Sequence, residues 1–184
     1  MMSFVRNSLS LSFAVAALAS VALTGCSPKQ TFPPTVANQP RLDTNLAPLP
    51  QLCAIGIKSG HEYSAASDES IVYNLPPGMS KPAWKTVGAN LPASARPSQP
   101  NDKNVVSVEE VRIDGGTAQV DVLIPNGEIY QLVTIHLSGS PFGPWKVTYV
   151  QPWMLRSVAS KCNNPFVAPT EVATGAELPS ATKQ

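Results

Sequence analysis

The sequence has few charged residues and no excess of one sign. Charged residues make up 14% of the 184 residues, against about a quarter in an ordinary soluble domain, and the net charge is +1. Arg6 is the only charged residue before Cys26, so a chain that starts at Cys26 has 12 basic and 12 acidic residues. Nucleic-acid binding requires a basic surface that displaces counterions from phosphates. We therefore expect no nucleic-acid partner.

Residues with catalytic or metal-binding chemistry are also scarce. The chain has two histidines and three cysteines, without an HExxH or zinc-type spacing, a phosphate loop, a dinucleotide fingerprint or a calcium loop. His61, beside Glu62, and His136 are candidates for an acid–base pair, but we interpret them as a surface histidine and a hydrogen-bonded sheet histidine. We predict no enzyme, no cofactor, no metal and no catalytic residues.

Regular alternation of apolar and polar residues is abundant between Val105 and Trp153. This period of two is typical of strands with one face on a core, and it predicts a four-stranded antiparallel meander. Asn126-Gly127 tolerates the positive φ of a two-residue hairpin loop, and such a loop would pair Val120 with Val133. An earlier turn is expected at residues 114–116, and the doublet at 109–110 indicates a β-bulge.

The segments around this stretch predict short helices. Residues 51–67 fit a helix or a strand, and we place the helix slightly ahead, starting at Pro50 and stopping at Gly60. A short strand is expected over residues 70–75, a helix capped by Ser80 runs through Asn90, and residues 152–161 predict a last helix. The sequence thus predicts a single small α+β domain over residues 51–162 with one to three short helices; the alternative is a mostly-β fold.

The first 26 residues have the pattern of an export signal. An apolar run from Leu9 to Leu23 is short for a membrane span and suits a signal peptide over residues 1–25. The next residues complete Leu23-Thr24-Gly25-Cys26, which resembles the lipobox of bacterial lipoproteins. The resemblance implies cleavage by signal peptidase II before Cys26 and attachment of lipid to that cysteine. An ordinary secreted protein or an uncleaved anchor are the alternatives.

This resemblance also implies a location. The lipid would hold the protein in the cell envelope, and Ser27 rather than an aspartate after the cysteine resembles the pattern for the periplasmic face of the outer membrane if the host is Gram-negative. Prolines crowd residues 26–50, which predicts a tether after the lipidated Cys26. Residues 163–184 are expected to be a flexible tail.

Cys53 and Cys162 remain at opposite ends of the predicted domain. Because an exported chain with an even remainder of cysteines favours a disulfide, we predict a Cys53–Cys162 bond. Two free thiols or a metal pair are the alternatives.

Aromatic residues offer the remaining candidate site. A ligand cleft between helix and sheet is predicted from the following residues: Trp84, Tyr130, His136, Trp145 and Tyr149. The alternative is that the aromatic residues simply fill the core. Residues 116–153, with Trp145-Lys146-Val147 in the last strand, resemble the NTF2-like or cystatin-like α+β folds, which host enzymes and binding modules alike.

The leading functional hypothesis is therefore a membrane-anchored, non-enzymatic binding or scaffolding module. Its partners would be the membrane, through the N-terminal lipid, and another envelope protein. A small-ligand-binding NTF2-like domain is the second hypothesis, and a small hydrolase that uses His61 or His136 is the third.

Overall fold

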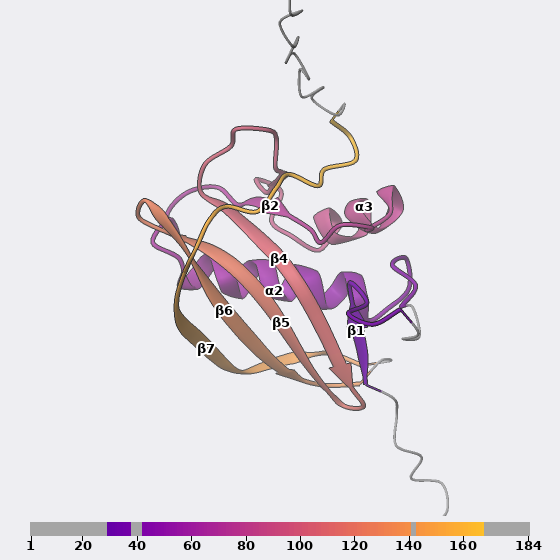
Figure 1. The fold of residues 1–184 in the computed structure, drawn as a ribbon. Helices are drawn as coiled ribbons and strands as arrows, with labels where there is room; N and C mark the ends of the chain where they lie inside the picture. The colour runs from indigo at the N-terminus through magenta and orange to yellow at the C-terminus, as the bar shows by residue number, and fades with distance from the viewer. Residues whose placement is uncertain (1–28, 38–41, 141–142, 168–184) are drawn as a thin grey trace, which may run out of the picture.

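The described residues form one mixed sheet with two helices on one face (Figure 1). The computed structural model describes residues 29–37, 42–140 and 143–167. Its helices are α2 (Leu49–Tyr63) and α3 (Lys81–Ala89). Its strands are β1 (Gln30–Phe32), β2 (Val72–Asn74), β3 (Arg96–Pro97), β4 (Val105–Asp114), β5 (Thr117–Asn126), β6 (Ile129–Ser138) and β7 (Lys146–Ser157). The prediction of a single small α+β domain is confirmed.

The predicted four-stranded antiparallel meander is wrong for the sheet as a whole. The strand order is β3-β2-β4-β5-β6-β7, and β1 also pairs with β4. Strands β4 to β7 are antiparallel neighbours, but β2 is parallel to both β4 and β3. β2 lies within the short strand expected over residues 70–75, which is confirmed, whereas β1 and β3 are only two or three residues long and too short to show an alternating pattern.

The β-bulge near the predicted doublet divides the edge of β4. The register with β5 shifts between Val108 and Glu110, which confirms the bulge. β2 pairs with β4 before Glu109, and β1 pairs with residues 111–113 after it. Residues 30–32 therefore belong to the sheet, although they lie inside the stretch of 26–50 that we predicted to be a tether.

The hairpin between β5 and β6 is confirmed, but its predicted register is wrong by two residues. Val120 pairs with Ile135 rather than Val133, because the loop is Gly127-Glu128 and Asn126 still pairs with Ile129. Gly127 has a φ of +66° at the first loop position, where a type II′ turn places glycine. A shift of two keeps each side chain on its face, so the predicted apolar face is buried as expected.

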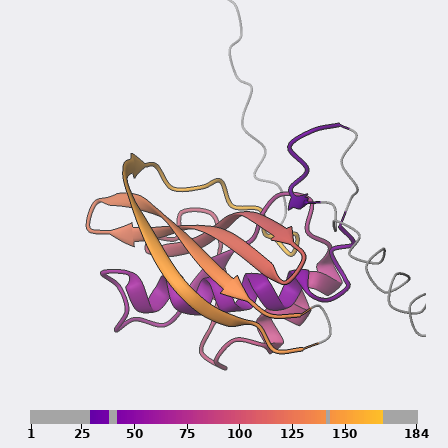
Figure 2. The ribbon, with the colours of Figure 1, turned by 90° about the horizontal axis from the view of Figure 1, so that it is seen from below.

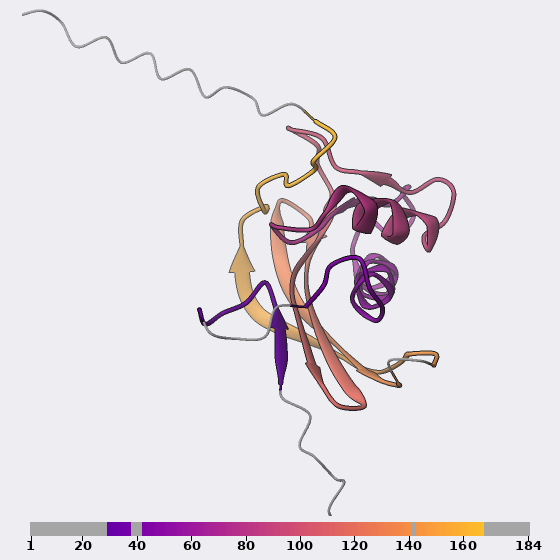
Figure 3. The same ribbon diagram turned by 90° about the vertical axis from the view of Figure 1, so that its right-hand side faces the viewer.

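Helix α2 packs its buried face on β4 and β5, and α3 lies beside it (Figures 2 and 3). The helix is confirmed, but Gly60 does not stop it. A Cβ at Gly56 would lie 2.6 Å from Val120 Cγ1, and one at Gly60 would lie 2.9 Å from Val122 Cγ1. The two glycines are one turn apart and let the helix approach the sheet. The cap of α3 is also confirmed, since Ser80 Oγ accepts a bond from Ala83 N at 3.2 Å.

The predicted helix over residues 152–161 is wrong, because β7 continues through Pro152 to Ser157. β7 is an edge strand, and proline is tolerated there because one side of its backbone needs no ladder partner. The C-terminal segment (residues 158–167) then crosses the face of the sheet opposite the helices (Figure 3). Asn74 anchors it, donating to Lys161 O at 2.9 Å and accepting from Asn163 N at 3.0 Å. The start of the predicted tail is therefore attached to the domain.

Candidate binding surfaces

The five residues of the predicted cleft lie on two sides of the sheet. Trp84 is buried under α3, where its ring stacks on Tyr73 with centroids 5.7 Å apart. Trp145 also lies on the helix side, next to α2. Tyr130, His136 and Tyr149 lie on the opposite face, which we call the open face. The structure therefore does not bring these five residues together in one cleft.

The open face holds a hydrogen-bond network that the sequence analysis missed. Arg112 donates to both oxygens of Asp121, at 2.6 and 2.8 Å, and these bonds raise the pKa of the guanidinium. Thr134 Oγ1 donates to Asp121 at 2.6 Å and accepts from Trp153 Nε1 at 2.8 Å. Neighbouring strands contribute these residues at the same level of the sheet, so the network fixes Trp153 on the open face.

His136 has no carboxylate partner in this network. Its Nε2 lies 3.3 Å from Gln151 Oε1, and its ring centroid is 5.5 Å from that of Tyr149. His61 is in the last turn of α2, on the other side of the sheet. Within the described ranges, no group of three His, Cys, Asp or Glu side chains could hold a metal ion. The arrangement favours a hydrogen-bonded histidine on a binding surface over an acid–base pair.

A partly buried carboxyl joins the open face to the C-terminal segment. Glu109, at the bulge of β4, accepts a short hydrogen bond from Ser160 Oγ. Burial raises the pKa of the Glu109 carboxyl, the Ser160 bond lowers it, and the nearby charge of Asp121 raises it further. The pKa of Glu109 therefore lies above its ordinary value in the folded protein. The bulge thus places a carboxyl where the C-terminal segment crosses the sheet.

The predicted Cys53–Cys162 disulfide is absent, and both thiols are free. Cys53 is buried in α2 on the helix side, where burial raises the pKa of its thiol to about 12. Cys162 is on the C-terminal segment, with Sγ 3.5 Å from Ser98 Oγ. The disulfide was predicted from the even number of remaining cysteines. No local signal in the sequence indicates that β7 carries Cys162 to the face of the sheet opposite α2.

β7 and the residues after it form an exposed apolar and basic surface. Met154 is 97% exposed. Exposed apolar residues on an edge strand are unusual, because they favour pairing with another chain. We call this the β7 surface; it follows the edge of the sheet and comprises the apolar residues Val147, Tyr149, Trp153, Met154, Leu155 and Val158 and the basic residues Lys146 and Arg156. A signal for it exists in the sequence, because no Asp or Glu occurs between Glu128 and Glu171.

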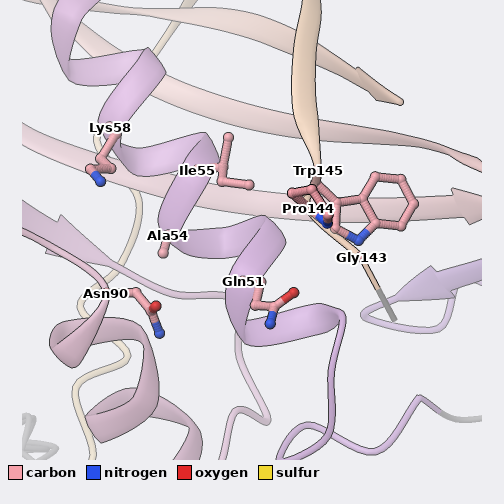
Figure 4. A pocket seen from close by; sticks show the side chains of 8 residues that line it. All are labelled: Gln51, Ala54, Ile55, Lys58, Asn90, Gly143, Pro144 and Trp145. Carbon is pink, nitrogen blue, oxygen red and sulfur yellow. The ribbon is translucent and has the colours of Figure 1, made fainter. Parts of the chain in front are cut away.

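An open groove of about 610 Å³ lies over the outer side of α2. Gln51, Ile55 and Lys58 line it from α2, Asn90 borders it at the end of α3, and Trp145 forms the far wall (Figure 4). Trp145 is 7% exposed, and its Nε1 has no hydrogen-bond partner among the described residues. Trp84 Nε1 lacks a partner in the same way but belongs to the core, so an unpartnered indole alone does not define a ligand site.

A second cavity, of about 770 Å³, lies between the loop after β3 and the C-terminal segment. Asn74, Ser98 and Cys162 line it, and they already bond to one another or to backbone. Its walls therefore join the C-terminal segment to the sheet.

Comparison with known proteins adds no relative: no family model, curated protein or solved structure matches this chain. The NTF2-like or cystatin-like resemblance stays a prediction. In the part of the chain that the structure describes, no helix is long and apolar enough to cross a membrane. Residues 1–28, including the lipobox and Cys26, lie outside the described residues.

Proposed function

We propose that this protein is an envelope lipoprotein, anchored through Cys26, whose α+β domain is a non-enzymatic binding module. The observation that carries the binding role is the β7 surface. Six large apolar side chains are exposed along one edge strand and its continuation, and three of them, Trp153, Met154 and Leu155, are consecutive. Contiguous exposed apolar patches on a folded domain mark contact sites, whereas isolated exposed apolar residues are ordinary.

The proposal of a lipid anchor rests on the resemblance of Leu23-Thr24-Gly25-Cys26 to a lipobox. With such an anchor, weak contacts are sufficient for the domain to bind its partner. A domain held near its partner binds at a high effective concentration, so a modest patch gives substantial occupancy. The scaffold is suited to this role, because the network of Arg112, Asp121 and Thr134 fixes Trp153 in position. A preformed surface loses less side-chain entropy on binding.

Two tyrosines provide a matched test of the binding role. Tyr149, on the β7 surface, is 58% exposed, and Tyr63, at the end of α2 on the helix side, is 51% exposed. Each is replaced in turn by photoreactive p-benzoylphenylalanine, and the protein is irradiated in its own host. We expect the variant at 149 to form a recurrent adduct with an envelope component. No adduct at 149, or the same adducts from both positions, would contradict a binding surface on β7.

The groove over α2 supports small-ligand binding as a second candidate function. Its specific observation is the groove of about 610 Å³ itself, where Trp145 forms an aromatic wall and Gln51, Lys58 and Asn90 add polar side chains. Trp145→Phe replaces the indole by a smaller ring and shortens this wall. We expect a small molecule to co-purify with the natural protein and to be lost from this variant, as measured by native mass spectrometry. Identical mass spectra without any bound compound would reject this candidate.

A further inference from the structure

We propose that the partner of the β7 surface is the anionic lipid surface of the membrane to which the protein is anchored. This inference rests on the proposed function, because it requires the lipid at Cys26. It adds that the domain contacts the head groups directly, through Trp153 and its neighbours. Three independent features of the chain support it: charge, residue type and the distance from the anchor.

The charge of the β7 surface complements anionic lipid. Lys146 and Arg156 are exposed, and neither forms an ion pair among the described residues. β7 contains these two cations and no carboxylate side chain, while the mature chain as a whole is neutral. The strand thus carries a net positive charge. Basic residues close to a membrane are attracted by anionic head groups.

The apolar residues of the surface are of the types that suit the membrane interface. Trp153 and Tyr149 combine an apolar ring with a polar atom, as the aromatic residues at membrane–water interfaces do. Met154 and Leu155 are exposed beside them and can enter the boundary between head groups and acyl chains. Arg156 follows at once, where its long side chain can reach the phosphates.

The anchor is close to the sheet, because β1 begins at Gln30. Only residues 27–29 separate it from Cys26, and this link spans about 14 Å at full extension. From β1 the sheet continues through β4, β5 and β6 to β7, a width of about 19 Å at ordinary strand spacing. The two lengths are comparable. The domain therefore stays at the membrane, and β7 reaches the head groups when the open face turns toward them.

A second copy of the chain fits the β7 surface less well. Pairing two such surfaces would bring Lys146 and Arg156 of one copy near the same residues of the other, and like charges oppose that contact. An acidic protein would also complement the charge, but nothing in the chain places such a protein at β7, whereas the link places the membrane there.

The test uses the lipidated full-length protein with p-benzoylphenylalanine at 149 or at 63. It is reconstituted in vesicles of phosphatidylcholine, or of phosphatidylcholine mixed with phosphatidylglycerol, and adducts are identified by mass spectrometry. We expect lipid adducts from position 149 in the mixed vesicles, and few from position 63. Removing charge by Lys146→Gln and Arg156→Gln should lower the yield at 149 by roughly fivefold for each basic residue. The matched pair Lys58→Gln and Lys85→Gln, on the helices, should leave it unchanged.

The outcomes separate this inference from the proposed function. Labelling of Cys26 by a palmitate analogue is measured on the same preparation; unlabelled protein would overturn the anchor and this inference together. Labelled protein that gives equal lipid adducts at 149 and 63, or none at 149, overturns the membrane contact alone. Adducts at 149 with a protein or with a second copy of this chain also overturn it, and they leave the binding role of β7 intact.

Discussion

Individual side chains of this domain have opposite surroundings on the two sides of the sheet. Cys53 is completely buried against apolar residues, and the pKa of its thiol rises to about 12 because the thiolate would lose its hydration. Glu109 lies at the bulge among polar groups, but partial burial raises its pKa as well. In both cases the folded protein favours the neutral form, and each residue gives a measurable consequence.

The two free cysteines should react at very different rates. We expect iodoacetamide to modify Cys162 in the native protein, because it is partly exposed, and to leave Cys53 unmodified. Thiolates are the reactive species, and the raised pKa of Cys53 keeps it protonated at neutral pH. Peptide mapping by mass spectrometry measures both sites. In denaturant both should react, which serves as the control. Two cysteines that react only after reduction would instead reveal a disulfide.

Glu109 should make stability depend on pH in the acid range. Its pKa in the folded protein lies above the ordinary 4.5, so between these two values the folded state holds a proton that the unfolded chain has lost. The free energy of unfolding therefore falls as pH rises through this window. Glu109→Gln should remove that slope and make the protein more stable at neutral pH, while leaving its stability unchanged well below pH 4.5.

Urea unfolding at a series of pH values measures this effect. Glu62→Gln, on the exposed end of α2, is the control and should keep the slope of the natural protein. If Glu109→Gln lowers stability at neutral pH, the bond from Ser160 outweighs the cost of burying the carboxylate.

Among the elements, α2 depends most on close approach to the sheet. Gly56 and Gly60 lie over Val120 and Val122 of β5, at distances that leave no room for a methyl group. In the sequence these glycines weaken a helix and suggest its end, because glycine has poor helix propensity. In the structure they determine how closely the helix packs.

Replacing Gly56 by alanine should therefore destabilise the domain. Its Cβ would lie 2.6 Å from Val120 Cγ1, and overpacking of this kind costs about 1–3 kcal/mol. Better helix propensity offsets about 1 kcal/mol of that cost. Chemical denaturation measures the difference. Lys58→Ala, on the exposed side of the same helix, is the control and should have little effect. Unchanged stability of Gly56→Ala would mean that the helix can move away from β5 at little cost.

Elements with a strong local pattern were predictable, and elements determined by tertiary pairing were not. The cap at Ser80 and the alternation along β5 and β6 are local signals, so α3 and the buried face were found. The pairing of β5 with β6 was displaced by two residues, since Asn126-Gly127 and Gly127-Glu128 both fit a tight loop. β1 and the end of β7 form only because neighbouring strands offer free backbone groups.

The difference between local signals and tertiary pairing also explains which parts of the candidate sites could be predicted. Aromatic residues were identified from the sequence, but which face of the sheet each one occupies depends on register and on the position of α2, so Trp84 and Tyr149 were wrongly assigned to one cleft. The network around Asp121 is formed by residues from four strands and has no local signal. The β7 surface did have one, in the absence of acidic residues from 129 to 170.

For the whole molecule, only residues 27–29 separate the proposed anchor at Cys26 from β1, so a lipid on Cys26 would keep the domain close to the membrane. Cys26→Ser should abolish labelling by a palmitate analogue and release the protein from membranes or leave it unprocessed, because the serine offers no thiol for the diacylglycerol. Metabolic labelling followed by membrane fractionation measures both effects. Ser27→Ala, which keeps the cysteine, is the matched control and should be labelled normally. If the serine variant is still labelled, the lipid is attached elsewhere, and the proximity of β7 to the membrane loses its basis.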